Sequence, residues 1–255
     1  MVGFCYHGGM SWSITRQLLF ALGALIVVSA LGAFVYFSFF FTPATCSDGV
    51  QNNTEEGVDC GGSCARLCVA PNLSTVWARS VPVAPGVYHA VAQIKNPDTA
   101  AAGSFAYTVS LYDAENILIT ERRGTFGILP GEVATLFEAN LVTGERVPTR
   151  TFVDIGPGTF SRAERGSSPV HTVSFELDET RPRLAVVIEN QSLFPVRDVV
   201  VTALLFNNAE VVTSASQTML DFLAPRERRE VLFTWQEPFS ELPQRVEVVP
   251  RVVAP

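Results

Sequence analysis

Hydrophobic and polar positions follow two different patterns along this chain. Residues 18–41 form one uncharged apolar run, which at about 1.5 Å per residue can cross a hydrocarbon core of about 30 Å as a helix. After residue 75, short runs rich in β-branched and aromatic residues alternate with Pro, Gly and Asn, a pattern typical of strands joined by turns. The sequence therefore predicts a mainly β protein with one N-terminal transmembrane helix.

The β region divides into two similar sets of strands. We expect strands at residues 76–81, 87–95, 105–112, 117–122, 133–140, 151–155, 170–177, 184–189, 199–206, 210–214, 230–235 and 245–249. Ile94-Lys95-Asn96 aligns with Ile188-Glu189-Asn190 at an offset of 94 residues, and Leu111-Tyr112-Asp113 aligns with Leu205-Phe206-Asn207. The offset becomes 95 at Pro130 and Pro225. This internal repeat predicts two tandem β-sandwiches of about seven strands each.

The expected domain organisation has five parts. They are an N-terminal segment (1–17), the transmembrane helix (18–41), a cysteine-rich segment (42–72), the first sandwich (73–157) and the second sandwich (158–255). The repeated strand that ends in Leu111-Tyr112-Asp113, followed by a turn and a Pro130-Gly131 corner, resembles FxLYD-type immunoglobulin-like domains. The second copy departs from that pattern, with Leu205-Phe206-Asn207 and Pro225-Arg226. The resemblance implies an immunoglobulin-like fold for both copies.

The orientation of the predicted helix follows from its flanking charges. Arg16 is the only charged residue before Asp48, so the positive-inside rule places the N-terminus in the cytoplasm and the rest of the chain outside the cell membrane. Two alternatives remain open. A signal peptide usually has a shorter apolar core, and a type IV pilin-like start resembles a basic leader ending in Gly with a Glu soon after it, which this chain lacks.

Four cysteines follow the apolar run within 23 residues: Cys46, Cys60, Cys64 and Cys68. So small a segment cannot bury a core of its own, and outside the cell cysteines are oxidised, which predicts two disulfides with three pairings open. Zinc is the competing explanation, although the spacing lacks paired C-x₂-C motifs. Cys5 lies on the opposite side of the predicted membrane and is left without a partner.

Acidic and amide side chains are dense between the first two of these cysteines. Asp48, Asn52, Glu55 and Asp59 offer the hard oxygen ligands that calcium prefers, in a loop that contains glycine. The spacing does not fit an EF-hand, and Asx residues beside glycine are equally what tight turns require. We therefore keep calcium and turn formation as two interpretations of the same residues.

The segment from Cys46 to Cys64 resembles a motif of predicted bacterial and archaeal surface proteins, roughly C-x-D-G-x-x-N-x-x-E-x-G-x-D-C-G-G-x-C. In such proteins the motif is a small extracytoplasmic module beside adhesive or structural domains. The resemblance implies a prokaryotic cell-surface location more firmly than it implies an activity.

Charge and motif content bear on the function. Residues 48–255 carry 25 acidic and 17 basic side chains, which argues against a nucleic-acid partner. No G-x-S-x-G elbow, P-loop or H-E-x-x-H motif is present, and His89 and His171 lie in separate predicted strands, so we expect no enzyme activity.

The expected function is that of a single-pass structural or interaction protein for adhesion or envelope assembly. Residues 18–41 would contact lipid, and the two predicted sandwiches (residues 73–255, called the head below) would bind a protein or a surface polymer. The alternative is an accessory subunit of a secretion or pilus-like apparatus.

Overall fold

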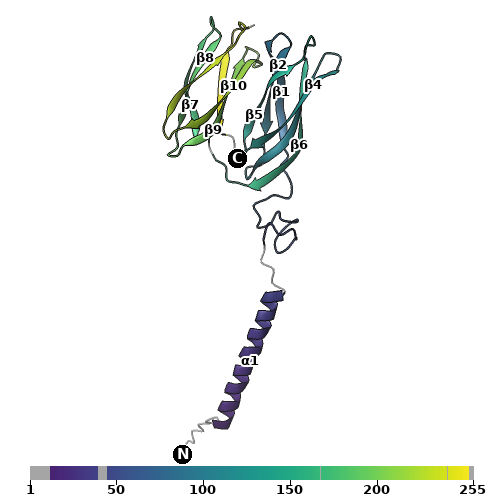
Figure 1. Ribbon diagram of the computed structural model, residues 1–255, viewed down its shortest axis with the longest axis vertical. Helices are drawn as coiled ribbons and strands as arrows, with labels where there is room; N and C mark the ends of the chain where they lie inside the picture. Colours follow the sequence, from purple (N-terminus) through teal and green to yellow (C-terminus); the bar gives the residue numbers. More distant parts are fainter. Residues whose placement is uncertain (1–11, 40–44, 167, 240, 253–255) are drawn as a thin grey trace, which may run out of the picture. The chain divides into compact units, whose positions relative to one another are not determined.

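The computed structural model describes residues 12–39, 45–166, 168–239 and 241–252. Within these ranges one α-helix is followed by twelve β-strands, and the expected mainly β fold class is confirmed (Figure 1). The chain forms two compact units, Met1–Ser63 and Cys64–Pro255. The first contains the helix and most of the cysteine-rich segment, and the second contains all the strands.

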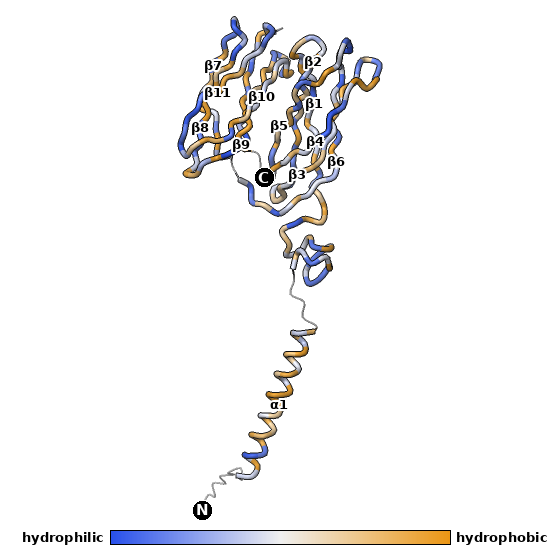
Figure 2. Tube along the Cα trace, viewed as in Figure 1, coloured by the Kyte–Doolittle hydropathy of each residue, from blue (hydrophilic) through white to orange (hydrophobic). Residues whose placement is uncertain are grey.

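Helix α1 spans Trp12–Phe39 and is 28 residues long. It begins before the predicted start at residue 18, and residues 40 and 41 of the apolar run lie outside the described ranges. None of its residues is buried, and the hydropathy colouring is apolar along most of its length (Figure 2). By length and composition α1 can cross a membrane, a property shared by membrane anchors and signal sequences.

The strands occur in the expected order, and each overlaps one predicted strand. Their bounds are β1 Ser74–Ala84, β2 Val87–Lys95, β3 Ala101–Tyr112, β4 Leu118–Ile128, β5 Val133–Val142, β6 Arg150–Arg162, β7 Val170–Asp178, β8 Arg183–Asn190, β9 Val196–Phe206, β10 Val212–Leu223, β11 Arg228–Thr234 and β12 Arg245–Val252. The largest difference is β10, which continues to Leu223 although the expected strand ends at residue 214.

The strands pair into four antiparallel sheets of three strands each. The first sandwich consists of β1-β2-β5 and β4-β3-β6, and the second of β11-β8-β7 and β10-β9-β12. Adding six to each strand number of the first sandwich gives the pairing of the second. Six strands are therefore described in each sandwich, where about seven were expected.

Each sandwich encloses its own hydrophobic core, and a third cluster lies between the sandwiches. Alternate residues of β2 and β9, among them Ile94 and Val201, face the cores of their own sandwiches. Their neighbours Val91, Leu204 and Phe206 face the other way and pack together. Sheets β1-β2-β5 and β10-β9-β12 therefore lie face to face, which produces four layers of sheet (Figure 1).

A buried asparagine ends the second strand of each sandwich. Asn96 is 1% exposed and donates from Nδ2 to the carbonyl oxygen of Leu129 at 2.9 Å. Asn190, 94 residues later, is fully buried and donates from Nδ2 to the carbonyl oxygen of Leu223 at 3.2 Å. Both side chains also accept a hydrogen bond from the backbone N–H two residues ahead. These hydrogen bonds explain why a polar residue can be buried at the end of each of the two strands.

The turn before the fifth strand of each sandwich also has matching contacts. The carboxylates of Glu132 and Glu227 accept hydrogen bonds from the N–H three residues earlier, at 2.7 and 2.6 Å. The residue before each glutamate has a positive φ, 64° at Gly131 and 59° at Arg226. Only glycine adopts this left-handed conformation without steric cost, so the turn at Arg226 is strained relative to its counterpart.

Strand β6 continues to Arg162, beyond the expected domain boundary at residue 157. Near its end it receives the last part of the cysteine-rich segment, because Leu67 N–H donates to the Phe160 carbonyl at 2.8 Å and Arg162 N–H donates to the Ala65 carbonyl at 2.7 Å. The Leu67 side chain also packs against the first core. Residues 65–67 are thus an integral part of the first sandwich.

Candidate functional site

All four cysteines of the cysteine-rich segment form disulfides. The bonds are Cys46–Cys64 and Cys60–Cys68, which is one of the three pairings left open by the sequence. Zinc binding by cysteine requires thiolates, and a disulfide offers none. The expected disulfide-rich segment is therefore confirmed, and these cysteines are not zinc ligands.

The residues expected to bind calcium are held by hydrogen bonds to nearby backbone groups. Asp59 accepts from the N–H groups of Asp48 at 2.9 Å and Gly49 at 3.0 Å, and Glu55 accepts from the N–H of Asn52 at 3.1 Å. Asn52 in turn donates from Nδ2 to Asp48 at 2.9 Å. The bond between Asn52 and Glu55 has the spacing of a tight turn, whereas the Asp59 carboxylate joins the two ends of the loop across 10 and 11 residues. Hydrogen bonds within the loop therefore account for the placement of these side chains. Calcium binding stays a prediction.

The pKa of Asp48 is lowered from its ordinary value. The main cause is the hydrogen bond from the Thr45 hydroxyl at 2.7 Å, followed by the bond from the Val50 N–H at 2.9 Å. Both bonds favour the ionised carboxylate because they are donated to its oxygens. The carboxylate is therefore charged at neutral pH and engaged in the turn.

The two histidines of the β region lie on different sandwiches. His89 is on β2, where its Nδ1 accepts a hydrogen bond from the Asn140 N–H at 3.1 Å, and burial lowers its pKa. His171 is exposed on β7 and lies opposite Glu189 in the register. The structure thus places these side chains apart, as structural members of two sheets.

The contact between the two sandwiches combines apolar packing with an ion pair. Arg251 on β12 extends to Glu132 of the first sandwich, with Nε to Oε1 at 2.8 Å, and its guanidinium lies 4.7 Å from the centre of the Phe126 ring. The side chains of Arg251 and Glu132 are only 13% and 20% exposed. Because its charge is paired and largely buried, Arg251 fixes the first sandwich to the second.

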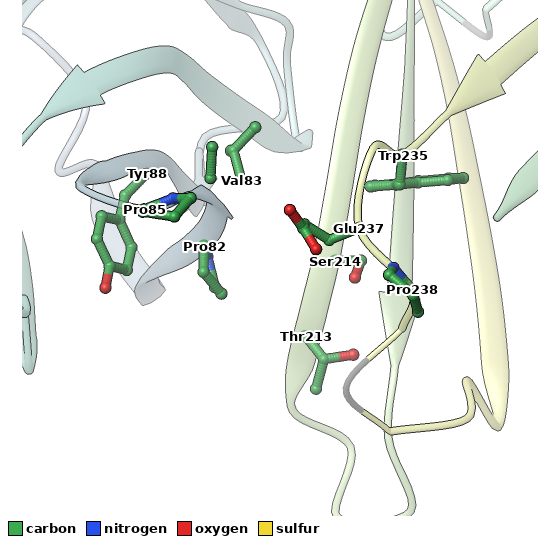
Figure 3. A pocket seen from close by; sticks show the side chains of 10 residues that line it. Pro82, Val83, Pro85, Tyr88, Thr213, Ser214, Trp235, Glu237 and Pro238 are labelled. Atoms are coloured by element: carbon green, nitrogen blue, oxygen red, sulfur yellow. The ribbon is translucent and has the colours of Figure 1, made fainter.

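A cleft of about 390 Å³ opens at one end of this contact (Figure 3). One wall is the hairpin between β1 and β2, with Pro82, Pro85 and Tyr88, and the opposite wall comes from the start of β10 and the residues after β11. The hairpin turns at Pro85-Gly86, where Gly86 has a φ of 72°, the pattern of a type II turn. The volume of the cleft lies within the range of small-ligand sites, about 300–1,000 Å³.

Two β-bulges shape the walls of the cleft. The β1–β2 register shifts between Pro82 and Ala84, and the β10–β9 register shifts between Val212 and Ser214. A bulge redirects side chains and is frequent beside functional sites. Both irregularities lie at residues that line the cleft, so the strands depart from regular pairing on each side of it.

The cleft combines flat apolar surfaces with one charge. Trp235 follows β11 and stacks edge-to-face on Phe239 with ring centres 5.4 Å apart. Its indole Nε1 is buried and has no hydrogen-bond acceptor among the described residues. Glu237 is the one charged residue among the described residues that line the cleft, and its carboxylate points toward the β1–β2 hairpin (Figure 3). The site is therefore aromatic and negatively charged.

Sequence reasoning missed both the sandwich contact and the cleft. A usable signal was the nearly continuous apolar run on β9, Val199-Val200-Val201 and then Ala203 to Phe206, interrupted only by Thr202. Strands buried on both faces have such runs, whereas strands with one solvent face alternate. The cleft had no comparable signal, because its walls are more than 120 residues apart in the chain.

Comparison with known proteins adds little to the structure. No protein-family model matches the chain, and no curated protein matches it. Among solved structures, the crystal structure of red sea bream transglutaminase matches with 14% identity and a TM-score of 0.25. The match covers 73% of this chain and 32% of that one, so the chain spans about a third of that protein's length. We draw no conclusion about activity from a likeness this low.

Proposed function

We propose that this chain is a membrane-anchored, extracytoplasmic interaction protein without catalytic activity. The observation that carries the proposal is helix α1, which exposes every one of its residues and contains no acidic side chain and one arginine. Leaving apolar surface in water costs about 25 cal/mol per Å². A helix of this length and composition is stable where lipid covers it.

Two features support an N-terminus in the cytoplasm and a C-terminal head outside. Arg16 lies in the N-terminal part of α1, which the positive-inside rule assigns to the cytoplasm. The disulfides follow the helix, and disulfides persist in oxidising compartments outside the cytoplasm. Both arguments give the same topology from independent chemistry.

The head supports an interaction role. Its two sandwiches share the apolar cluster around Val91 and Leu204 and the Arg251–Glu132 ion pair, so the described head has the contacts of a single packed body. A stiff head can hold an edge strand or a cleft in place for a partner protein or surface polymer. Adhesion and envelope assembly both require such a presented surface.

Thiol labelling of intact cells tests the topology. Cys5 is the remaining cysteine of the sequence, and Glu230→Cys would add an exposed thiol on β11. We expect a membrane-impermeant maleimide to label Glu230→Cys in intact cells and to label Cys5 only after permeabilisation. A Cys5→Ser variant controls for labelling of other thiols. Labelling of Cys5 in intact cells would contradict the proposal.

The alternative role in a secretion or pilus-like apparatus makes a different prediction. In that case the helix itself contacts other membrane proteins, so partners recovered by crosslinking should be lost when residues 18–41 are replaced by an unrelated apolar span. For the proposed interaction role, partners should instead depend on the head and survive this replacement.

A further inference from the structure

We propose that the cleft between the β1–β2 hairpin and the residues after β11 binds an arginine side chain of a partner protein. This inference deepens the proposed interaction role and rests on it. It is carried by three properties of the cleft: the sign of its charge, the shape and chemistry of its walls, and its position on the head.

The charge of the cleft selects a cation. Glu237 points into the cleft (Figure 3), and it has no hydrogen bond or ion pair to any described residue. No basic residue lies among the described residues that line the site, so an anionic ligand would meet repulsion without compensation. A cationic group would instead form a charge-assisted hydrogen bond with the Glu237 carboxylate.

The walls favour a planar cation over a compact one. Tyr88 and Trp235 line opposite walls of the cleft, where each side chain also packs against the core of its own sandwich. A guanidinium group is flat and weakly hydrated, and it stacks on aromatic faces while it donates in its own plane to a carboxylate. The ammonium group of lysine is a strongly hydrated point charge that gains less from such walls.

Further acceptors are available for the remaining guanidinium N–H groups. Thr213 and Ser214 line the floor of the cleft beside the β10 bulge, and each hydroxyl oxygen can accept a hydrogen bond. Thr213 donates its own hydroxyl hydrogen to the Leu205 carbonyl at 3.4 Å, which directs its lone pairs away from that carbonyl. The cleft therefore offers acceptors to a group that has only donors.

The backbone around the site is held in place before any ligand arrives. Pro82, Pro85 and Pro238 line the cleft, and a proline ring fixes φ near −65°. Little conformational entropy is then lost when the side chain of a partner is clamped. The hairpin also lies at the end of β1 opposite to Ser74, so the cleft is at the end of the head that is remote from the point where the cysteine-rich segment joins β1.

Titration of the full-length protein in detergent micelles with short peptides tests this inference. The probes are acetyl-Gly-Arg-Gly-amide and its citrulline and lysine counterparts, and the readout is the NMR shift of the Trp235 indole N–H, assigned with Trp235→Phe. We expect saturable binding of the arginine peptide, with a Kd at least tenfold higher for the citrulline peptide and severalfold higher for the lysine peptide. The Trp12 indole should not shift.

Two charge-removing variants separate the cleft from general electrostatics. Glu237→Gln should raise the Kd of the arginine peptide about tenfold, whereas Glu230→Gln, which removes the same charge from an exposed site on β11, should leave it within twofold. Equal affinity for arginine and citrulline, unchanged affinity in Glu237→Gln, or no saturable shift would overturn the inference. The titration does not depend on membrane orientation, so its failure is distinct from a failure of the topology test.

Discussion

Replacement of Arg251 by methionine should show how much the ion pair between the two sandwiches contributes to the free energy of unfolding, compared with an ion pair on the exposed surface. Arg251 and Glu132 form a largely buried pair, and removal of one partner of such a pair costs about 3–5 kcal/mol. Glu132 keeps its hydrogen bond from the Leu129 N–H at 2.7 Å. Because that bond compensates part of the remaining charge, we expect a loss of about 2–3 kcal/mol in the free energy of unfolding.

Arg245 on the same strand is the matched control. It pairs with Glu210 and Glu247 at 2.8 Å each, but its side chain is 41% exposed and its partners are 68% and 32% exposed. Exposed pairs contribute about 0–1 kcal/mol, so Arg245→Met should cost no more than about 1 kcal/mol. Thermal unfolding in mild detergent, followed by near-UV circular dichroism, should show Tm falling by roughly 5–10 °C for Arg251→Met and by less than about 4 °C for Arg245→Met.

Equal losses in the two variants would refute this reasoning. Burial is the main difference between the two arginines, since both are on β12, both form ion pairs at 2.8 Å and both lie over a phenylalanine ring. If burial did not separate them, Arg251 would be exposed to water in solution. The sandwiches would then not be fixed to each other by this pair.

Three further predictions concern the turns and one strand. Asn190→Ala removes the Nδ2 donor from one buried carbonyl group, that of Leu223, and from the part-buried carbonyls of Phe194 and Ala224. Urea unfolding should therefore show a loss of about 2–4 kcal/mol, and a loss below about 1 kcal/mol would contradict the assigned role. Gly131→Ala should destabilise the protein by about 1 kcal/mol and Arg226→Gly should stabilise it slightly, because both positions are left-handed; equal signs would count against this. His89 has a lowered pKa in the folded state, so its contribution to stability is complete above pH 6.5 and is lost as the pH falls below that value. Comparison of Tm at pH 7.5 and 5.5 with that of His89→Gln isolates the effect, and an unchanged pH dependence in the variant would exclude His89 as its source.

Much of the fold followed from local sequence patterns. The strand on residues 105–112 was expected from alternating residues, and the structure buries Phe105, Val109 and Leu111 on one face of β3. The Pro130-Gly131 corner was expected from turn chemistry, and Gly131 adopts the left-handed conformation. Periodicity and turn residues act within a few positions of the chain, so a linear reading can detect them.

Less of the candidate site could be predicted from local sequence patterns. By residue type, Asp48, Asn52, Glu55 and Asp59 are candidate calcium ligands, and the structure places each of them in hydrogen bonds of the loop. Composition states which atoms are present, whereas a metal site depends on where those atoms point. Only the folded loop shows that backbone N–H groups reach these carboxylates.

The sequence by itself determined the apolar helix, the order of the twelve strands and the oxidised cysteines, because each depends on residue type and short spacing. Tertiary structure decided the rest. It selected the Cys46–Cys64 and Cys60–Cys68 pairing, the face-to-face packing of two sheets and the cleft that brings Tyr88 opposite Trp235. These features join residues that are distant in the chain or choose among equivalent partners, and the packing of the two sheets buries both faces of β2 and β9 at once.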